Sequence, residues 1–337
     1  MATATDVRPV SPDLPSAAAP RWLRGIFLAN LIAQMAIVVT GGVVRLTGSG
    51  LGCPTWPECV EGSYTPTNRQ EEAWHKYVEF GNRLLTFVLA ALAIAAVIGA
   101  IAWLAKSRRQ QRNPRMPVVA LAFLPFAGTV GQAVLGGITV LTGLNPWVVA
   151  AHFLVSMAII AGCVLLVVRA GEPGDTPVSA LVPNAIRWLG RILVIVTAAV
   201  VVLGTVVTGS GPHSGDADTE ARFGLDPRTV SWLHADVVLL FLGLLIGMLV
   251  ALHVTQGPRR ARVFAGSLLA VSVAQGLVGY TQYFTGLPWV LVAIHMLGAT
   301  IVWALSVFVL LSLRARGAVV DQLTNGSMAT ARNSSAR

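Results

Sequence analysis

Long apolar stretches alternate with short polar segments along the chain, and eight of these stretches are long enough to cross a bilayer. A hydrocarbon core of about 30 Å requires roughly 20 helical residues. The pattern therefore predicts an all-α, polytopic membrane protein with eight transmembrane helices. The connectors 142–145 and 285–287 are short enough to predict tight antiparallel hairpins. The approximate helix limits are Leu23–Val44, Trp74–Leu104, Pro117–Leu141, Pro146–Val168, Trp188–Thr208, Val230–Leu252, Val263–Phe284 and Pro288–Leu313.

Composition agrees with a membrane protein and excludes an ordinary soluble domain. Of the 337 residues, 55% are hydrophobic and only 12% are charged, about half the charged share of typical soluble domains. The net charge of +9 does not indicate a nucleic-acid partner. Lysines and arginines lie in short clusters between apolar runs, and they form no basic helix face. We therefore expect a multi-pass protein of the bacterial plasma membrane, with the lipid bilayer as its environment.

Basic residues mark one side of the predicted membrane. They lie before the first helix, in the even-numbered loops and after the last helix, whereas the first and fifth loops are acidic. By the positive-inside rule, both termini are expected on the cytoplasmic side. Residues 1–20 and 316–337 are expected to be disordered cytoplasmic tails. Residues 1–20 lack the pattern of a cleavable signal peptide, so we expect the first helix to be retained.

The sequence of the first four predicted helices recurs in the last four. Residues 131–152 (GQAVLGGITVLTGLNPWVVAAH) match residues 274–295 (AQGLVGYTQYFTGLPWVLVAIH) at one constant offset, with Gln, Thr-Gly-Leu and His in the same places. Thr-Gly-Ser-Gly also follows both the first and the fifth predicted helix. The chain thus divides into two four-helix halves, 21–170 and 171–315. Because each half crosses the membrane an even number of times, the halves share one orientation and are expected to be related by an axis along the membrane normal.

Four of the six histidines lie near the outer ends of the even-numbered helices. Ionisable groups within a membrane are costly and usually functional. Two imidazoles that face each other across a four-helix bundle suit the axial positions of haem iron. Zinc is less suited, because neither half gathers the three or four ligands that it requires. For any single histidine, the alternative is a hydrogen-bonded packing residue. The four residues are His75, His152, His234 and His295.

The second predicted helix carries the densest polar cluster of the chain, formed by His75, Glu79, Asn82 and Arg83. Spacings of four and seven residues place the first three on one helical face. A carboxylate at Glu79 beside a haem would act as a base, or would bind and orient water. The alternative is an intrahelical ion pair between Glu79 and Arg83, which would stabilise the carboxylate without giving it a catalytic role.

Two of the three cysteines, Cys53 and Cys59, lie in the first outer loop. A pair on the oxidising face of the membrane predicts a disulfide. Such a bond would either staple the loop or take part in redox chemistry. Cys163 lies alone within the fourth predicted helix, where we expect a small core residue.

Residues 41–59 (GGVVRLTGSGLGCPTWPEC) closely resemble the first-loop signature of haem A synthase. The motif is long and distinctive. The duplicated eight-helix plan and the four histidines match that family over nearly the whole chain, apart from the two tails. The short chain and the loop cysteines resemble the bacterial, actinobacterial branch.

The resemblance implies a membrane oxidoreductase that converts haem O into haem A, the haem of aa3-type terminal oxidases. In that family, the C8 methyl group is oxidised to a formyl group by successive hydroxylations, with water as the oxygen source. The C-terminal half would hold a haem B cofactor between His234 and His295. The N-terminal half would receive haem O, with His152 as one iron ligand. A family glutamate that assists the oxidation matches Glu79, and the family's paired loop cysteines match Cys53 and Cys59.

One position departs from the family pattern. The family commonly shows Glu-x-x-His-Arg on the second helix, whereas this chain has Asn82 in place of the histidine. Asparagine is a poor haem ligand. Either His75 substitutes from about two turns farther out, or His152 is the single protein ligand and the other position is left for water. Helices two and six can be aligned on His75 or on Asn82, so the internal repeat leaves both alternatives open.

Further partners follow from the same resemblance. Arg45 and Arg83 would pair with haem propionates, because a guanidinium matches carboxylate geometry, although Arg45 would equally suit an interfacial anchor. The chain shows no nicotinamide- or ATP-binding motif, so a quinone or another membrane electron acceptor is expected, and haem O synthase is a further expected partner. The alternatives are a di-haem b-type electron carrier without haem-modifying activity, and a transporter that uses its repeat interface.

Overall fold

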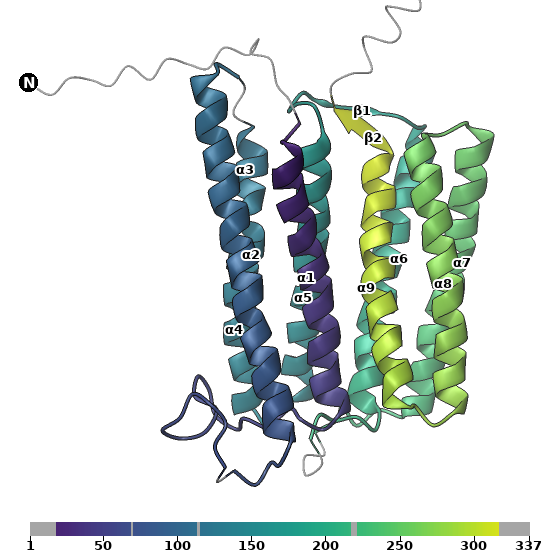
Figure 1. Cartoon of the computed structure of the whole chain (residues 1–337). Helices are drawn as coiled ribbons and strands as arrows, with labels where there is room; N and C mark the ends of the chain where they lie inside the picture. The colour runs from purple at the N-terminus through teal and green to yellow at the C-terminus, as the bar shows by residue number, and fades with distance from the viewer. Residues whose placement is uncertain (1–17, 69, 113–114, 217–220, 317–337) are drawn as a thin grey trace, which may run out of the picture.

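The computed structural model describes residues 18–68, 70–112, 115–216 and 221–316, so the predicted tails lie almost entirely outside the described residues. The predicted all-α fold is confirmed (Figure 1), and eight helical spans are long and apolar enough to cross a membrane. The helices are α1 (Arg21–Leu46), α2 (His75–Arg109), α3 (Met116–Ala122), α4 (Leu124–Leu141), α5 (Pro146–Gly171), α6 (Asn184–Ser210), α7 (Pro227–Val254), α8 (Arg259–Phe284) and α9 (Trp289–Ser312), and the strands are β1 (Val178–Ala180) and β2 (Arg314–Arg316).

The third predicted helix is interrupted at Phe123, which separates α3 from α4. Pro125 explains the interruption, because proline has no N–H and its ring clashes with the carbonyl of the residue four positions earlier. The N–H of Phe123 instead bonds to the carbonyl of Ala120 over 3.2 Å, in a tighter turn. The two pieces together still form one membrane span.

Both predicted hairpins are present, and they use the same backbone conformation. Gly143 and Leu144, between α4 and α5, both have a φ of 59°. Gly286 and Leu287, between α8 and α9, have φ values of 78° and 59°. The left-handed region favours glycine, and here one glycine begins each turn. The sequence repeat is therefore also a repeat of backbone geometry.

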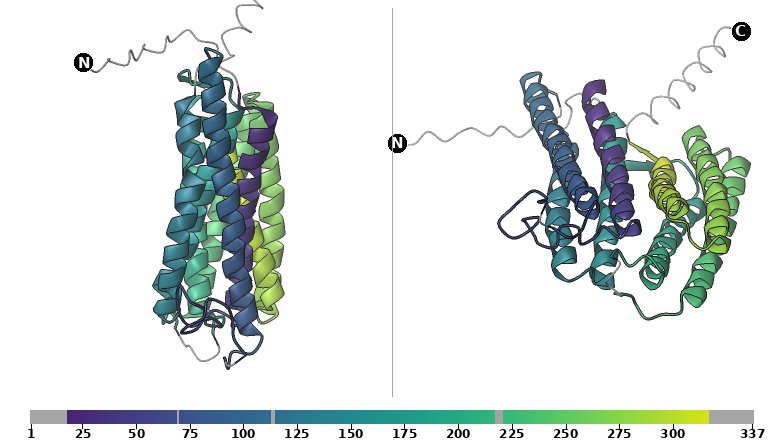
Figure 2. Two further views of the ribbon diagram at one scale, coloured as in Figure 1. Left: turned by 60° about the vertical axis from the view of Figure 1, so that its left-hand side comes forward. Right: turned by 60° about the horizontal axis from the view of Figure 1, so that its bottom comes forward.

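The helices form two groups that meet along the middle of the molecule (Figures 1 and 2). The first group runs from α1 to α5 and the second from α6 to α9. At their junction α9 packs against α1 and α5, and α6 packs against α5. Val164 of α5 and Val307 of α9 belong to the hydrophobic core at this junction. The indole Nε1 of Trp303 also donates to the carbonyl oxygen of Met157 over 2.7 Å, which fixes the second group against the first.

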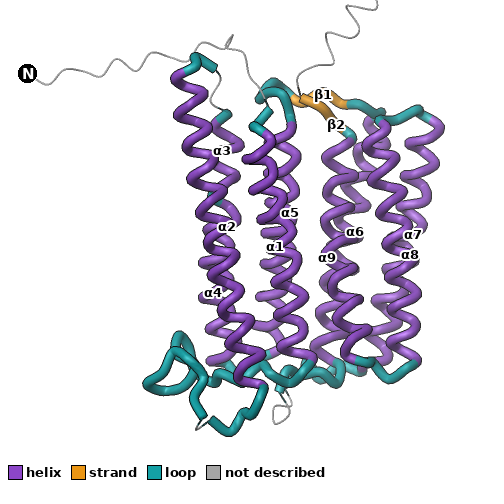
Figure 3. Tube along the Cα trace, viewed as in Figure 1, coloured by secondary structure: helices purple, strands orange, loops and turns teal. Residues whose placement is uncertain are grey.

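The loops are distributed unequally between the two ends of the bundle (Figure 3). The long loop between α1 and α2 lies at one end, at the bottom of the view, together with the start of α5, α7 and α9. The start of α1 and the strand β2 lie at the opposite end. The positive-inside rule would make that opposite end cytoplasmic, and this orientation stays a prediction.

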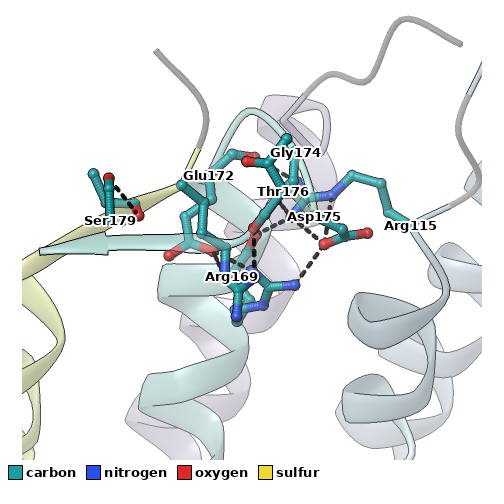
Figure 4. Close-up of polar contacts among 9 residues, drawn as sticks. Arg115, Arg169, Glu172, Gly174, Asp175, Thr176 and Ser179 are labelled. Atoms are coloured by element: carbon teal, nitrogen blue, oxygen red, sulfur yellow. Dashed lines mark hydrogen bonds and ion pairs between the residues drawn. The ribbon is translucent and has the colours of Figure 1, made fainter. Parts of the chain in front are cut away.

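A buried arginine cluster fixes the start of the linker between the two groups (Figure 4). Arg115 is fully buried. Its guanidinium donates to the carbonyls of Arg169 and Gly174 over 2.9 and 3.2 Å, and also to that of Glu172. Arg169 forms ion pairs of 2.5 Å with the carboxylates of Glu172 and Asp175. These contacts satisfy the carbonyls that the end of α5 exposes.

The other end of the linker pairs with the segment that follows α9. Strands β1 and β2 are antiparallel, with Val178 opposite Arg316 and Ala180 opposite Arg314. The guanidinium of Arg316 also donates to the carbonyl oxygen of Thr176 over 2.7 Å. The linker is therefore attached both to the end of α5 and to the end of the last helix.

Candidate functional site

Three of the four predicted histidines occupy the same depth in their helices. His152, His234 and His295 lie six or seven residues beyond the first residues of α5, α7 and α9, which is about 10 Å at 1.5 Å per residue. The Nδ1 atom of each ring is buried and has no hydrogen-bond partner in the described part of the chain. Buried polar atoms are normally paired, so three imidazoles at one depth, each with an unpaired Nδ1, indicate a ligand site.

A glycine on the preceding helix faces each of these three rings. A Cβ atom in its place would lie in van der Waals contact with the ring carbon Cε1, so each glycine packs closely beside its imidazole. The pairs are Gly136 with His152 at 3.4 Å, Gly204 with His234 at 3.5 Å and Gly279 with His295 at 3.4 Å.

The second group of helices supplies two of these rings, His234 from α7 and His295 from α9. Helix α6 packs against both α7 and α9, so the two rings belong to one helical bundle. Each has a glycine on its flank, Gly204 or Gly279. An imidazole offers a nitrogen lone pair to a metal, and two such rings across a helical bundle form an axial pair for haem iron. The residues present therefore fit a bis-histidine haem.

In the first group of helices, Asn82 stands at the position that His234 occupies in the second. Asn82 lies seven residues after the first residue of α2, as His234 does after the first residue of α7. Gly41 of α1 faces it, and a Cβ atom at Gly41 would lie 3.8 Å from Nδ2 of Asn82. The hydroxyl of Thr40 donates to Oδ1 of Asn82 over 2.8 Å. The sequence left two alignments of these helices open, one on His75 and one on Asn82. The geometry favours the alignment of α2 with α7 on Asn82.

His75 lies in a different environment from the other three histidines. It is the first residue of α2, its Nδ1 is hydrogen-bonded to the Ser49 hydroxyl over 2.8 Å, and its ring stacks on Trp74. His75 lines a surface hollow of about 210 Å³ that Arg45 and His213 also border. Seven residues, or about 10 Å, separate it from Asn82 along the helix axis.

Glu79 is buried, and the loop between α1 and α2 folds down onto it. Its Oε1 accepts from Nη2 of Arg83 over 2.7 Å, which is the intrahelical pair considered as an alternative above. Its Oε2 accepts from the backbone N–H of Cys53 over 2.6 Å. No sequence pattern indicates this second contact, because it joins a loop amide to a helix residue 26 positions away.

Arg83 and the disulfide hold the same loop in place. Cys53 and Cys59 form a disulfide bond, as predicted. Arg83 donates to the carbonyls of Cys53, Thr55 and Glu58 over 2.8, 3.0 and 3.1 Å. All of these acceptors lie within the disulfide segment 53–59. The loop is thereby fixed over the first turns of α2.

Comparison with known proteins decides the family. Residues 24–214 match the family model of the cytochrome oxidase assembly proteins, COX15-CtaA. The chain belongs to this family. Its matched region contains Glu79, the disulfide loop and His152, whereas His234 and His295 lie beyond it. As a family member with eight apolar spans and bacterial relatives, the chain is a multi-pass protein of the cell membrane.

Several individual relatives carry the name "Heme A synthase". The protein from Lysinibacillus sphaericus is 28% identical over 191 residues, 56% of this chain and 58% of the relative. The one from Exiguobacterium sibiricum is 30% identical over 53% of this chain and 56% of the relative. The one from Methylobacterium sp. is 31% identical over 58% of this chain and 59% of the relative. The chain thus spans between half and three fifths of the length of these relatives.

Within this family member, both arginines proposed to bind propionates have protein partners. Arg83 bonds to the loop, as described above. Arg45 donates to the carbonyls of His213 and Thr208 over 2.8 and 3.3 Å, and so connects α1 to the last turn of α6 and to the segment that follows it. Burial, together with the positive charge of Arg45, lowers the pKa of the His213 imidazole below its ordinary value. Arg45 therefore joins the two groups of helices at the end of the bundle that carries the α1–α2 loop.

Proposed function

We propose that this protein is a haem A synthase that oxidises the C8 methyl group of haem O to the formyl group of haem A, for aa3-type terminal oxidases. The observation that supports it most is the difference between two otherwise matched halves. One half offers two imidazoles, His234 and His295. The other offers His152 and, at the place of the second imidazole, Asn82. A cofactor that stays bound suits the half with two imidazoles, whereas a substrate that must leave suits the half with one.

The second half would hold haem B through His234 and His295. Haem B would supply a one-electron redox centre there. The chain's contribution is to orient the two rings, each of which lies beside a glycine of the preceding helix. A haem held by two protein side chains in this half would serve as a resident cofactor.

The first half would receive haem O, with His152 as its protein ligand. The position at Asn82 would then be left to water, the oxygen source that the family resemblance implies. His75 lies about 10 Å farther out in a hydrogen bond to Ser49, so we assign it no iron ligation. Haem O would therefore be held by one protein ligand in this half.

Glu79 would accept a proton from the reacting water or orient that water, as a general base. Its carboxylate is buried, and it already binds Arg83 and the N–H of Cys53. This arrangement fixes the carboxylate in one orientation at membrane depth. The disulfide loop thereby becomes part of the proposed catalytic structure, because one of its amides binds the catalytic residue.

The atom balance of the reaction defines the remaining partners. Conversion of a methyl group and one water into a formyl group releases four protons and four electrons. The electrons require an acceptor, for which we propose a quinone or another membrane electron carrier. Haem O would be delivered by haem O synthase. The name shared by the relatives supports the reaction, and the acceptor is our own inference.

Substitution of Glu79 distinguishes this enzyme from a di-haem electron carrier. In cells that make haem O, Glu79→Ala should leave haem B bound to the purified protein but lower haem A formation at least about 100-fold, the contribution of a general base. Glu61→Ala, which removes an exposed carboxylate of the same loop, should convert haem O at the unsubstituted rate. If Glu79→Ala also converts at that rate, Glu79 has no catalytic role.

A further inference from the structure

Each half of the molecule carries a glutamine that is hydrogen-bonded to its histidine-bearing helix. Gln132 lies on α4 and Gln275 on α8, at matching places in the repeat. Nε2 of Gln132 donates to the backbone carbonyl of His152 over 2.9 Å. Nε2 of Gln275 donates to that of His295 over 3.0 Å. The same contact is therefore built twice, each time to a histidine proposed to bind haem iron.

The other end of each amide has no partner. Oε1 of Gln132 and Oε1 of Gln275 are buried without a hydrogen bond among the described residues, and so are the Nδ1 atoms of His152 and His295. Each half thus leaves one unused acceptor and one unused ring nitrogen on two residues already in contact. Buried polar atoms are rarely left unpaired, so the coincidence in both halves requires an explanation.

Two different devices hold the amides in place. Nε2 of Gln132 also lies 2.6 Å from the Ser156 hydroxyl. In the other half, Gln275 lies against the backbone of Gly298, where a Cβ atom would come within 1.3 Å of Nε2. Gly298 is one turn beyond His295 on α9, so any side chain there would displace the amide. The residue that holds the amide thus differs between the halves, whereas the position of the amide against the histidine-bearing helix is the same.

A metal-bound imidazole normally donates its second N–H to an acceptor, which fixes the tautomer and the ring orientation and raises the basicity of the ligand. We propose that Gln275 is the positioning residue for His295, and Gln132 for His152: when these histidines hold haem, the unpaired Oε1 would accept the Nδ1–H, a bond that is not made between the two residues in the structure. This inference rests on the proposed function, because it requires haem iron at these histidines.

The midpoint potential of the resident haem in the purified, full-length protein tests the proposal without an activity assay. Gln275→Glu offers a stronger acceptor and should shift the potential downward, because a more basic imidazole favours ferric iron. Gln275→Leu removes the acceptor and should shift it upward. Gly298→Ala should follow the leucine variant, because its Cβ displaces the amide. Gln132→Leu, the matched control in the other half, should leave this potential unchanged.

Shifts of Gln275→Glu and Gln275→Leu in the same direction, or no shift in either, would overturn the proposal, since loss of a purely structural contact affects both alike. If the leucine variant does not accumulate, the glutamate variant decides alone, and an unchanged or raised potential overturns it. Failure of the proposed function would look different. Either the unsubstituted protein would contain no haem, or His295→Ala would retain the unsubstituted haem spectrum.

Discussion

The backbone N–H of Cys53 donates a hydrogen bond of 2.6 Å to Oε2 of Glu79. The backbone of one disulfide cysteine is therefore hydrogen-bonded directly to the carboxylate that we place in catalysis. Arg83 closes the arrangement, because it binds the other oxygen of Glu79 and the carbonyl of Cys53. The loop and the membrane carboxylate form one unit, and a change in either is expected to affect the other.

Removal of the disulfide should reduce both stability and conversion. Its six-residue separation corresponds to about 2 kcal/mol of loop-closure free energy, so Cys53→Ser and Cys59→Ser should lower the thermal unfolding temperature in detergent. Haem A formation should fall because Glu79 loses its fixed partner, while haem B at His234 and His295 remains. Cys163→Ala, at the free buried cysteine, is the control. If the serine variants convert haem O at the unsubstituted rate, the disulfide is not needed for the catalytic role of Glu79.

Substitution at Asn82 tests the alignment of the two halves. Because Asn82 matches His234, Asn82→His should create a second axial ligand in the first half. Haem O should then bind about tenfold tighter, a gain of about 1.4 kcal/mol, and show the low-spin absorption spectrum of a bis-histidine haem. His75→Ala should leave the haem O spectrum unchanged. If His75→Ala instead changes the haem O spectrum in the way expected for loss of an iron ligand, then His75 binds the substrate iron together with His152.

Acidification should weaken the outer connection between the two groups of helices. The pKa of His213 is lower in the folded protein than its ordinary 6.5. The unfolded chain therefore binds the proton more readily, and stability falls as the pH drops below 6.5. Unfolding temperatures measured across this range should decline less for His213→Gln than for the unsubstituted protein. Equal slopes would show that His213 does not contribute.

The arginine cluster at the end of α5 should keep the linker between the two groups of helices folded. Arg115 is fully buried and bonds to several linker carbonyls, so Arg115→Ala leaves them unpaired and should cost about 3 kcal/mol or more. Limited proteolysis should then cleave within residues 172–183, whereas this segment should resist cleavage in the unsubstituted protein. Arg112→Ala, at an exposed arginine nearby, should leave the linker resistant, and the same cleavage in that variant would argue against a specific role of Arg115.

The sequence predicted the fold better than the site, for a physical reason. Membrane spans, hairpins and the repeat are local patterns, since apolar length, Gly-containing turns and a constant offset are visible along the chain. The disulfide was likewise visible in the spacing and location of its cysteines. The break at Phe123 is caused by Pro125. The sequence alone did not reveal it, because the apolar stretch that predicted one helix continues through this position.

The site depended on contacts between distant segments. No local pattern indicates that the amide of Cys53 reaches Glu79, that Arg45 bonds to the segment after α6, or that His75 meets Ser49. The matched glutamines were visible as part of the repeat. Their relation to the histidines appeared only when the helices were packed.

The central claim is tested most directly by chromatography of acid-extracted haem. The chain is expressed together with a haem O synthase in a host that has no haem A synthase of its own. The account predicts haem A, or its hydroxylated intermediate, in the extract, and neither compound with an empty vector. Haem B bound to the purified protein, with haem O unchanged in cells that supply a membrane electron acceptor, would contradict the claim and favour an electron carrier.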